Sequence, residues 1–215
     1  MNDKVLRSPV SKEELAQQPW LVVAPIKRQR MDELVGKSCE LGVGRLLPVV
    51  TQRVVIERMS VERLQTILNE AAEQCERLTV PILEEPRPLA DLLKAWPTDR
   101  LLFVGNEAGQ SPPLLSVALN CVTVKERFPP GFGSGTSSSP PSSVLSWGFM
   151  VGPEGGFDPK EMDFISSHSF VRLVGLGPRI LRAETAALVG LSLLQAILGD
   201  FARSPQRLKI KPNET

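Results

Sequence analysis

Short apolar runs alternate with helical patterns along most of the sequence, and this alternation limits the fold more than any other feature. Apolar runs at 21–26, 45–50, 80–83 and 99–105 are typical of buried strands, and 53–56 is a further short candidate. Helical patterns fill the intervals at 30–42, 61–78 and 88–96. Strands that alternate with helices form βαβ units, in which helices cover both faces of parallel strands. The sequence therefore predicts an α/β fold with a mostly parallel sheet.

The length of 215 residues suits one large domain, which we place at residues 20–200. A Gly-, Ser- and Pro-rich stretch at 128–143 cannot bury enough apolar surface to offset the entropy of ordering. We expect it to be a disordered surface insertion, because the pattern of strands and helices resumes directly after it. Residues 1–19 are expected to form a flexible N-terminal segment, and residues 201–215 a C-terminal tail.

Charge and rare residues exclude several classes of function. A formal net charge of +1 gives no overall basic field of the kind that binds long nucleic acids, although a local basic patch stays open. Three widely spaced cysteines and a single histidine, His168, argue against a disulfide scaffold and against a metal site. The apolar runs are too short to span a membrane. We expect a reducing compartment: the cytoplasm or, alternatively, the plastid or mitochondrial matrix.

Two further strand–loop–helix units make up the C-terminal third. In the first, Asp158 is the expected N-cap, Pro159 the first helical residue and Glu161 the partner in a capping box. In the second, a long helix ends near Gly199 and carries no charged residue from Ala186 onward. A helix that is apolar on nearly every face has to be covered on several sides. We therefore expect a subunit interface there in addition to the core.

Three strand-to-loop segments contain glycines: VGNEAG (104–109), VGPEGGF (151–157) and VGLGPRILRAET (174–185). In an open parallel sheet, ligands bind beyond the carboxyl ends of the strands, and glycines let backbone groups approach them. None of the loops has the GK[ST] sequence of a Walker motif, and GLGPRI lacks the third glycine of a dinucleotide fingerprint. Backbone recognition with carboxylates nearby suits an adenosine that carries a positive centre, such as S-adenosylmethionine. The alternative is that these glycines only form turns.

VGPEGGF, followed by Glu161, and LGPRILRAETA resemble the signature segments of the RsmE family of SPOUT-class methyltransferases. ELGVGRLLPVVTQR and NEAAEQCERLTVP are similar to N-terminal segments of that family, so the resemblance covers residues 21–198 apart from the insertion. It implies S-adenosylmethionine-dependent methylation of N3 of a uridine in small-subunit ribosomal RNA, by a homodimer. It also implies a C-terminal trefoil knot that binds the cofactor, which general rules of chain topology would not predict.

The resemblance assigns roles to residues of the three loops. The cofactor site that it implies consists of Gly105, Glu107, Gly152, Pro153, Glu154, Gly155, Gly156, Leu176, Gly177, Ile180, Leu181 and Arg182. Methylation of uracil N3 requires removal of its proton, for which Glu154 and Glu184 are the candidate acceptors. Arg182 is the candidate to stabilise the anion that forms on the base. Each of these three side chains has a structural alternative, such as capping a loop.

Several side chains of the N-terminal half are candidates for RNA contacts. Segments that match the family's substrate side, or that follow the first strand, contribute Arg53, Gln74, Arg77, Lys27, Arg28 and Arg30. The alternative is a solvated surface of ion pairs. The family's small N-terminal β-barrel, similar to a PUA domain, is expected to be largely absent, because the first expected strand begins at Leu21. The alternative function is therefore a non-catalytic knotted module for RNA binding or ribosome assembly.

Overall fold

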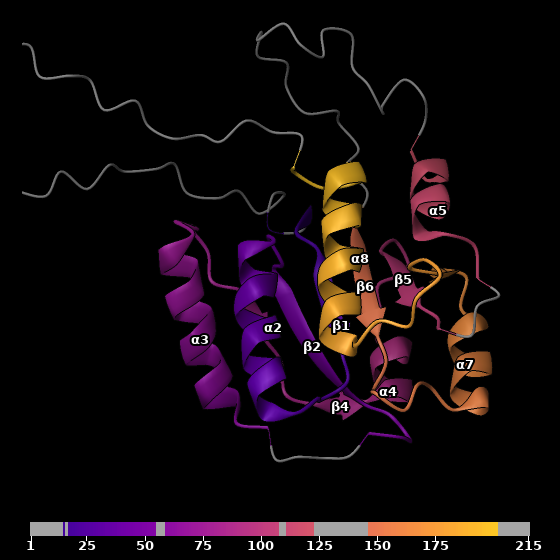
Figure 1. The fold of residues 1–215 in the computed structure, drawn as a ribbon, viewed down its shortest axis with the longest axis horizontal. Coiled ribbons are helices and arrows are strands. Elements are labelled where there is room, and N and C mark those ends of the chain that lie inside the picture. Colours follow the sequence, from indigo (N-terminus) through magenta and orange to yellow (C-terminus); the bar gives the residue numbers. More distant parts are fainter. Residues whose placement is uncertain (1–14, 16, 55–58, 108–110, 123–145, 202–215) are drawn as a thin grey trace, which may run out of the picture.

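The computed structural model describes residues 15, 17–54, 59–107, 111–122 and 146–201. Strands and helices alternate along most of this chain (Figure 1). The elements are β1 (Trp20–Val23), α2 (Arg28–Glu40), β2 (Arg45–Val50), α3 (Val61–Gln74), β3 (Ile82–Leu83), β4 (Arg87–Pro88), α4 (Leu89–Lys94), β5 (Leu101–Gly105), α5 (Leu114–Asn120), β6 (Trp147–Val151), α7 (Pro159–Ser166), β7 (Val171–Val174) and α8 (Ala183–Ile197).

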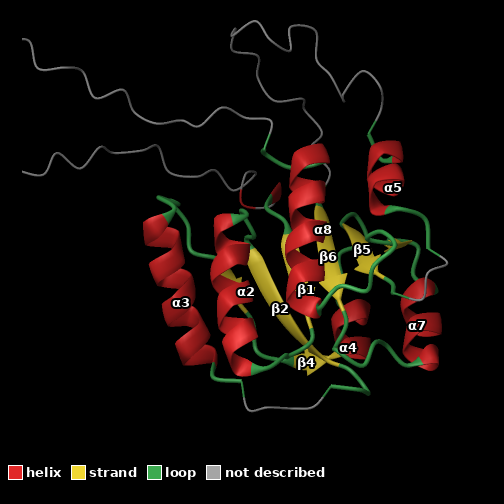
Figure 2. Ribbon diagram, viewed as in Figure 1, coloured by secondary structure: helices red, strands yellow, loops and turns green. Residues whose placement is uncertain are grey.

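The strands form one sheet in the order β3-β2-β1-β6-β5-β7, with β4 paired to the far end of β2. Every pair among these strands is parallel. Figure 2 shows the strands as a layer between helices, which is the α/β architecture that the sequence predicts. The strand order reverses between β1 and β6, so the two halves of the chain extend the sheet in opposite directions.

Alternate residues of each strand enter two separate hydrophobic cores, because successive side chains point to opposite faces of a sheet. Leu21 and Val23 of β1 pack with residues of α2, α3, α5 and α8. Val22, between them, packs with residues of α4 and α7 on the other face. The buried strands of the centre are apolar on both faces for this reason. Of the helices that the structure describes, none is long and apolar enough to cross a membrane.

Local signals at helix ends act as the sequence predicts. At the start of α7 the Asp158 side chain accepts a hydrogen bond from the backbone N–H of Lys160, and Glu161 accepts one from the backbone N–H of Asp158. Pro159 is the first residue of this helix. Beyond the C-terminus of α2, Gly42 has a φ of +84°, a left-handed conformation that glycine adopts without steric cost.

The structure departs from the predicted elements in several places, of which two are small: β1 ends at Val23 rather than at Ile26, and the two-residue β4 was not predicted. α3 ends at Gln74 rather than at residue 78, because the chain turns at Glu76, whose φ of +56° is left-handed. Arg53 lies in a turn rather than in a short strand. α5 is an element that the sequence did not suggest, because its seven residues are too few to show a helical period. Residues 1–14, 55–56, 128–143 and 202–215, for which expectations exist, lie outside the described residues.

Candidate functional site

A cleft of about 1000 Å³ opens at the carboxyl ends of β5, β6 and β7. These three strands are parallel neighbours, so the loops that follow them begin at the same edge of the sheet. Residues of all three glycine loops line the cleft: Gly105 to Glu107, Val151 to Phe157 except Gly155, and Gly175 to Arg182. The loops therefore converge on one hollow, as the sequence predicts.

Backbone hydrogen bonds join the first and third loops. The N–H of Asn106 donates to the carbonyl of Val174 over 2.9 Å, which extends the pairing of β5 with β7 into the loop. The N–H of Gly175 donates to the carbonyl of Pro112, and the carbonyl of Gly175 accepts from the N–H of Leu114, each over 2.9 Å. The third loop is thus held along its start by the segment that leads into α5. Fixed backbone groups of this kind are suited to recognise a ligand by its polar edge.

The second loop turns sharply at Gly156, whose N–H donates to the carbonyl of Pro153 over 2.9 Å. Gly156 has a φ of +68°, and a Cβ atom at this position would lie 2.5 Å from Oε1 of Glu107 in the first loop. Only a residue without a side chain allows both this conformation and this approach. The glycine therefore determines how closely the first two loops pack at the cleft.

Two side chains from outside the second loop hold it in place. Glu161 of α7 accepts a hydrogen bond from the N–H of Gln52, which follows β2, over 2.7 Å. Its other carboxylate oxygen accepts from the N–H of Asp158 in the capping box. Arg53 donates to the carbonyl of Gly155 over 3.1 Å and lies 3.6 Å from a carboxylate oxygen of Asp158. The loop after β2 is thereby fastened to the loop after β6.

Arg30, in the first turn of α2, lies between two carboxylates, one in a loop and one in a helix. Its Nη1 donates to Oε1 of Glu154 in the second loop. Its Nε lies 3.6 Å from Oε1 of Glu184, in the first turn of α8. The second oxygen of Glu184 is buried and has no hydrogen-bond partner among the described residues. Arg30 and Glu154 line the cleft, whereas Glu184 does not, so this cation joins a carboxylate of the cleft wall to one outside it.

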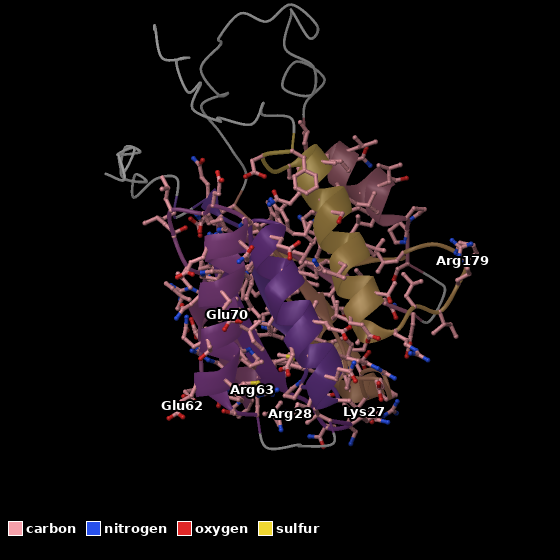
Figure 3. All side chains as sticks on the ribbon, turned by 60° about the vertical axis from the view of Figure 1, so that its left-hand side comes forward. Lys27, Arg28, Glu62, Arg63, Glu70 and Arg179 are labelled. Atoms are coloured by element: carbon pink, nitrogen blue, oxygen red, sulfur yellow. The ribbon has the colours of Figure 1, made fainter. Side chains whose placement is uncertain are left out.

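Two other cations of the cleft, Arg179 and Arg182, and two at the beginning of α2 are exposed to solvent. Arg182 occupies the N-cap position of α8 without a side-chain cap hydrogen bond, and it is exposed. Arg179 projects outward from the third loop, whereas Lys27 and Arg28 lie at the beginning of α2 (Figure 3). Within the described part of the chain, no hydrogen bond or ion pair engages these four side chains.

The predicted site residues fall into three groups by position. The cleft wall includes Gly105, Glu107, Gly152, Pro153, Glu154, Gly156, Leu176, Gly177, Ile180, Leu181 and Arg182 of the predicted cofactor site. It does not include Gly155, whose carbonyl accepts from Arg53, or Glu184, which lies behind Arg30. Arg30 and Arg53, predicted as RNA contacts, also line it. That these residues bind the cofactor or RNA stays a prediction.

Two predicted RNA contacts lie away from the cleft. Gln74 ends α3, and Arg77 donates to the carbonyls of Cys39 and Val43, each over 2.7 Å. Val43 precedes β2, so Arg77 is at the amino edge of the sheet, opposite the cleft. Its hydrogen bonds tie the end of α3 to the end of α2.

Further residues line the cleft that sequence reasoning did not select: Asn106, Ser111, Pro113, Phe157, Pro159, Met162, Pro178 and Arg179. Asn106 lies inside a quoted glycine loop, and its side chain donates to Oγ of Ser111 over 2.9 Å. Met162 comes from the second turn of α7, where nothing in the sequence separates it from an ordinary apolar helix position. Its position becomes evident only from the packing of α7 beside the cleft.

The groups with shifted pKa values do not line the cleft. Burial raises the pKa of the Cys39 thiol to about 11, and burial also raises that of Cys121. Burial lowers the pKa of the Arg100 guanidinium to about 10. These are structural sites rather than reactive ones, because the first two are protonated thiols and the third remains a cation at neutral pH. The described residues contain no group of His, Cys, Asp and Glu side chains that could hold a metal ion.

Residues 13–195 match the model of the RNA methyltransferase domain family. The chain is 29% identical to Ribosomal RNA small subunit methyltransferase E of Rickettsia conorii, over 89% of this chain and 68% of that protein. It is 31% identical to the protein of the same name from Synechocystis, over 91% of this chain and 58% of that protein.

Solved structures give the same result. A Ribosomal RNA small subunit methyltransferase E from Neisseria gonorrhoeae, bound to S-adenosyl methionine, superposes with a TM-score of 0.64 at 26% identity, covering 83% of this chain and 66% of that one. A Legionella pneumophila structure in complex with the cofactor SAM also gives 0.64, at 29% identity. The chain spans 58 to 68% of the length of these relatives. The resemblance read from the loop motifs is confirmed, and the chain belongs to the RNA methyltransferase domain family.

Proposed function

We propose that this protein is an S-adenosylmethionine-dependent methyltransferase that methylates N3 of a uridine in small-subunit ribosomal RNA. The observation that carries the proposal is the convergence of the three motif-bearing loops on one cleft of about 1000 Å³. A volume of this order accommodates a ligand of nucleoside size. The relatives named Ribosomal RNA small subunit methyltransferase E, and the cofactor bound in two of the similar structures, supply the identity of the ligand and the class of substrate.

The cleft offers the groups that an adenosine with a sulfonium centre needs. Backbone groups of 152–156 and 175–181, with few side chains in their way, suit the polar edge of an adenine. Glu107 and Glu154 line the cleft and provide negative charge for the sulfonium. When bound, the cofactor supplies an electrophilic methyl group. The loops would hold this group and the uracil nitrogen in line, an effect that contributes about 7–11 kcal/mol in well-oriented reactions.

The chain's own side chains would manage the proton and the charge of the base. N3 of uracil carries a proton, and Glu154 or Glu184 would accept it. Arg182 is exposed at the cleft and engages no carboxylate of the described chain, which leaves its guanidinium available to the anionic uracil oxygen. A knot in the C-terminal segment, as in the SPOUT class, is part of the proposal.

The target uridine has to be unpaired, because N3 lies on the edge that forms Watson–Crick pairs. The base would turn out of its strand into the cleft, and the flanking phosphates would remain at the rim. Arg179 lies at the cleft wall, and Lys27 and Arg28 lie apart from it at the beginning of α2 (Figure 3), which suits contacts with more than one phosphate of a single strand. Gln74 and Arg77 would meet RNA only at the opposite edge of the sheet.

A homodimer through α8 is part of the proposal. From Ala186 to Gly199 the helix has no charged residue. One of its faces packs on the sheet, and Leu188, Leu193 and Ile197 remain only partly buried in the single chain. A second copy of the same uncharged surface would complete their burial. A cytoplasmic location, where ribosomal RNA of bacteria is modified, completes the proposal.

Two measurements test the function. Isothermal titration calorimetry with S-adenosylmethionine should give saturable binding; absence of binding at millimolar cofactor would remove the enzymatic function. Ribosomal RNA from cells that lack the protein should then lose one N3-methyluridine, which returns on complementation with the wild-type chain. Cofactor binding combined with an unchanged RNA methylation map would favour the non-catalytic module instead.

A further inference from the structure

Arg30 connects three segments that are distant in the sequence. It lies in α2, and its two partners are Glu154 of the loop after β6 and Glu184 of α8. Glu154 is 124 positions away along the chain. The Arg30 side chain is 27% exposed and that of Glu184 only 17%. The guanidinium therefore ties one wall of the cleft to the beginning of the long apolar helix.

The chemistry of the bridge requires an arginine. Glu154 pairs with Nη1 and Glu184 with Nε, so the planar guanidinium contacts the two carboxylates along two of its edges at once. A lysine carries one compact charge with three rotatable donors on a flexible stem, so it would not fix two carboxylates in one planar geometry. Glu184 depends on this cation, because its other oxygen is buried without a partner among the residues that the structure describes. Loss of the cation would leave a largely buried carboxylate without compensation.

We infer that Arg30 is a positioning residue for methyl transfer, which holds Glu154 at the cleft wall and joins it to Glu184 at the start of α8. The inference rests on the proposed function. It differs from the RNA contact expected from the sequence, because the guanidinium already engages two carboxylates of its own chain. A displaced carboxylate or loop would misalign the reacting atoms, and misplacement of about 1 Å lowers rates on the order of 100-fold.

A second ion pair that involves α2 provides a matched control. Arg63 of α3 pairs with Asp32 of α2, and the side chains are 25% and 28% exposed. Asp32, like Glu184, has a buried oxygen without a partner among the described residues. Neither Arg63 nor Asp32 lines the cleft. Arg63→Gln therefore breaks a similar ion pair on the same helix without touching the site.

The experiment compares single-turnover methyl transfer in the wild type, Arg30→Gln, Arg30→Lys and Arg63→Gln, at saturating cofactor and across RNA concentrations. We expect the maximal rate of Arg30→Gln to fall on the order of 10- to 100-fold. Arg30→Lys should recover little of it, and Arg63→Gln should keep the wild-type rate. Thermal unfolding of each variant checks that the fold is retained.

Other outcomes overturn the inference in distinguishable ways. If Arg30→Gln raises only the RNA concentration needed for half-maximal rate, and Arg30→Lys restores it, Arg30 is a phosphate contact. Wild-type rates in both Arg30 variants, or an equal loss in Arg63→Gln, would give Arg30 no positioning role. A wild-type protein that transfers no methyl group to ribosomal RNA would instead defeat the proposed function, and the role of Arg30 would fall with it.

Discussion

Gly156 and Gly155 are adjacent in the sequence but differ in what their backbone requires. Gly156 has a left-handed φ of +68°, and a side chain there would collide with Glu107. At Gly155 a Cβ would make only ordinary contact, 3.6 Å from Cβ of Arg53. The sequence motif alone treats the two glycines alike, because φ is not visible in it. The structure therefore identifies Gly156, rather than Gly155, as the glycine of the second loop that is sensitive to substitution.

Substitution of Gly156 by valine should abolish most cofactor binding while the protein stays folded. A β-branched residue in this conformation would push the second loop away from Glu107 and widen the cleft. Titration calorimetry should show the cofactor dissociation constant rising about tenfold or more, or ~1.4 kcal/mol. Gly155→Ala is the matched control and should bind as the wild type does. Normal affinity in Gly156→Val would place the cofactor elsewhere.

Replacement of Arg182 by alanine should lower methyl transfer far more than cofactor binding. The guanidinium is exposed at the cleft and has no carboxylate partner among the described residues, so its removal costs the fold little. Loss of a group that stabilises an oxyanion lowers kcat by about 100- to 1000-fold. Single-turnover rates and cofactor titrations of the same preparation separate the two effects. Equal losses in both would reassign Arg182 to the cofactor.

At the scale of elements, the amino edge of the sheet is stabilised by a buried cation. Arg100 is 5% exposed and donates to the carbonyls of Gln18 and Trp147 over 3.0 and 2.9 Å. Its guanidinium lies 4.1 Å from the ring centroid of Trp20, in a cation–π contact. These contacts join the starts of β1, β5 and β6. They also offset part of the desolvation cost of the buried guanidinium, the same cost that lowers its pKa.

Arg100→Met should therefore destabilise the fold without affecting the cleft. Methionine fills the space of the stem but leaves the buried carbonyl of Trp147 and the half-buried carbonyl of Gln18 without this donor, which costs about 1–3 kcal/mol. Urea denaturation followed by circular dichroism measures the free energy of unfolding. Lys94→Met, on the exposed side of α4, is the control and should change it by less than about 0.5 kcal/mol. An unfolding free energy of Arg100→Met equal to the control's would mean that desolvation of the cation cancels its contacts.

Most elements could be predicted from the sequence, because each has a local signal. β2 has the predicted bounds, and the capping box of α7 forms from the predicted residues. The short α5 could not be predicted, since seven residues are too few to show a helical period. At the site, the glycine loops were evident, whereas the bridge from Arg30 to Glu154 and Glu184 was not. That bridge depends on how β1 and β6 become neighbours, which is a property of the strand order.

At the scale of the whole molecule, the sheet separates two kinds of chemistry. The carboxyl edge carries the cleft, its glycine loops and the exposed cations. The amino edge carries Arg100 and Arg77, whose guanidinium groups are used for backbone carbonyls of the fold. Parallel strands make this separation possible, because all of their carboxyl ends share one edge. A third surface, the uncharged outer side of α8, belongs to neither edge of the sheet.

α8 should hold two copies of the chain together. Its core face packs on β6, while Val189 and Ser192 are half-buried on its other side, beside Leu188 and Leu193. An uncharged helix surface of this kind is stable in water when a second apolar surface covers it. Sedimentation velocity at micromolar concentration should therefore give twice the mass of the chain for the wild type.

Val189→Glu tests this surface, because it would place two like charges near one another across a symmetric interface. We expect this variant to sediment as a folded monomer. Leu115→Glu, at a 50% exposed position on α5, should remain a dimer and controls for the added charge. A monomeric wild type, or a Val189→Glu variant that stays dimeric, would show that α8 is covered in some other way. If the monomeric variant still binds the cofactor in calorimetry, the cleft of one chain is sufficient for binding.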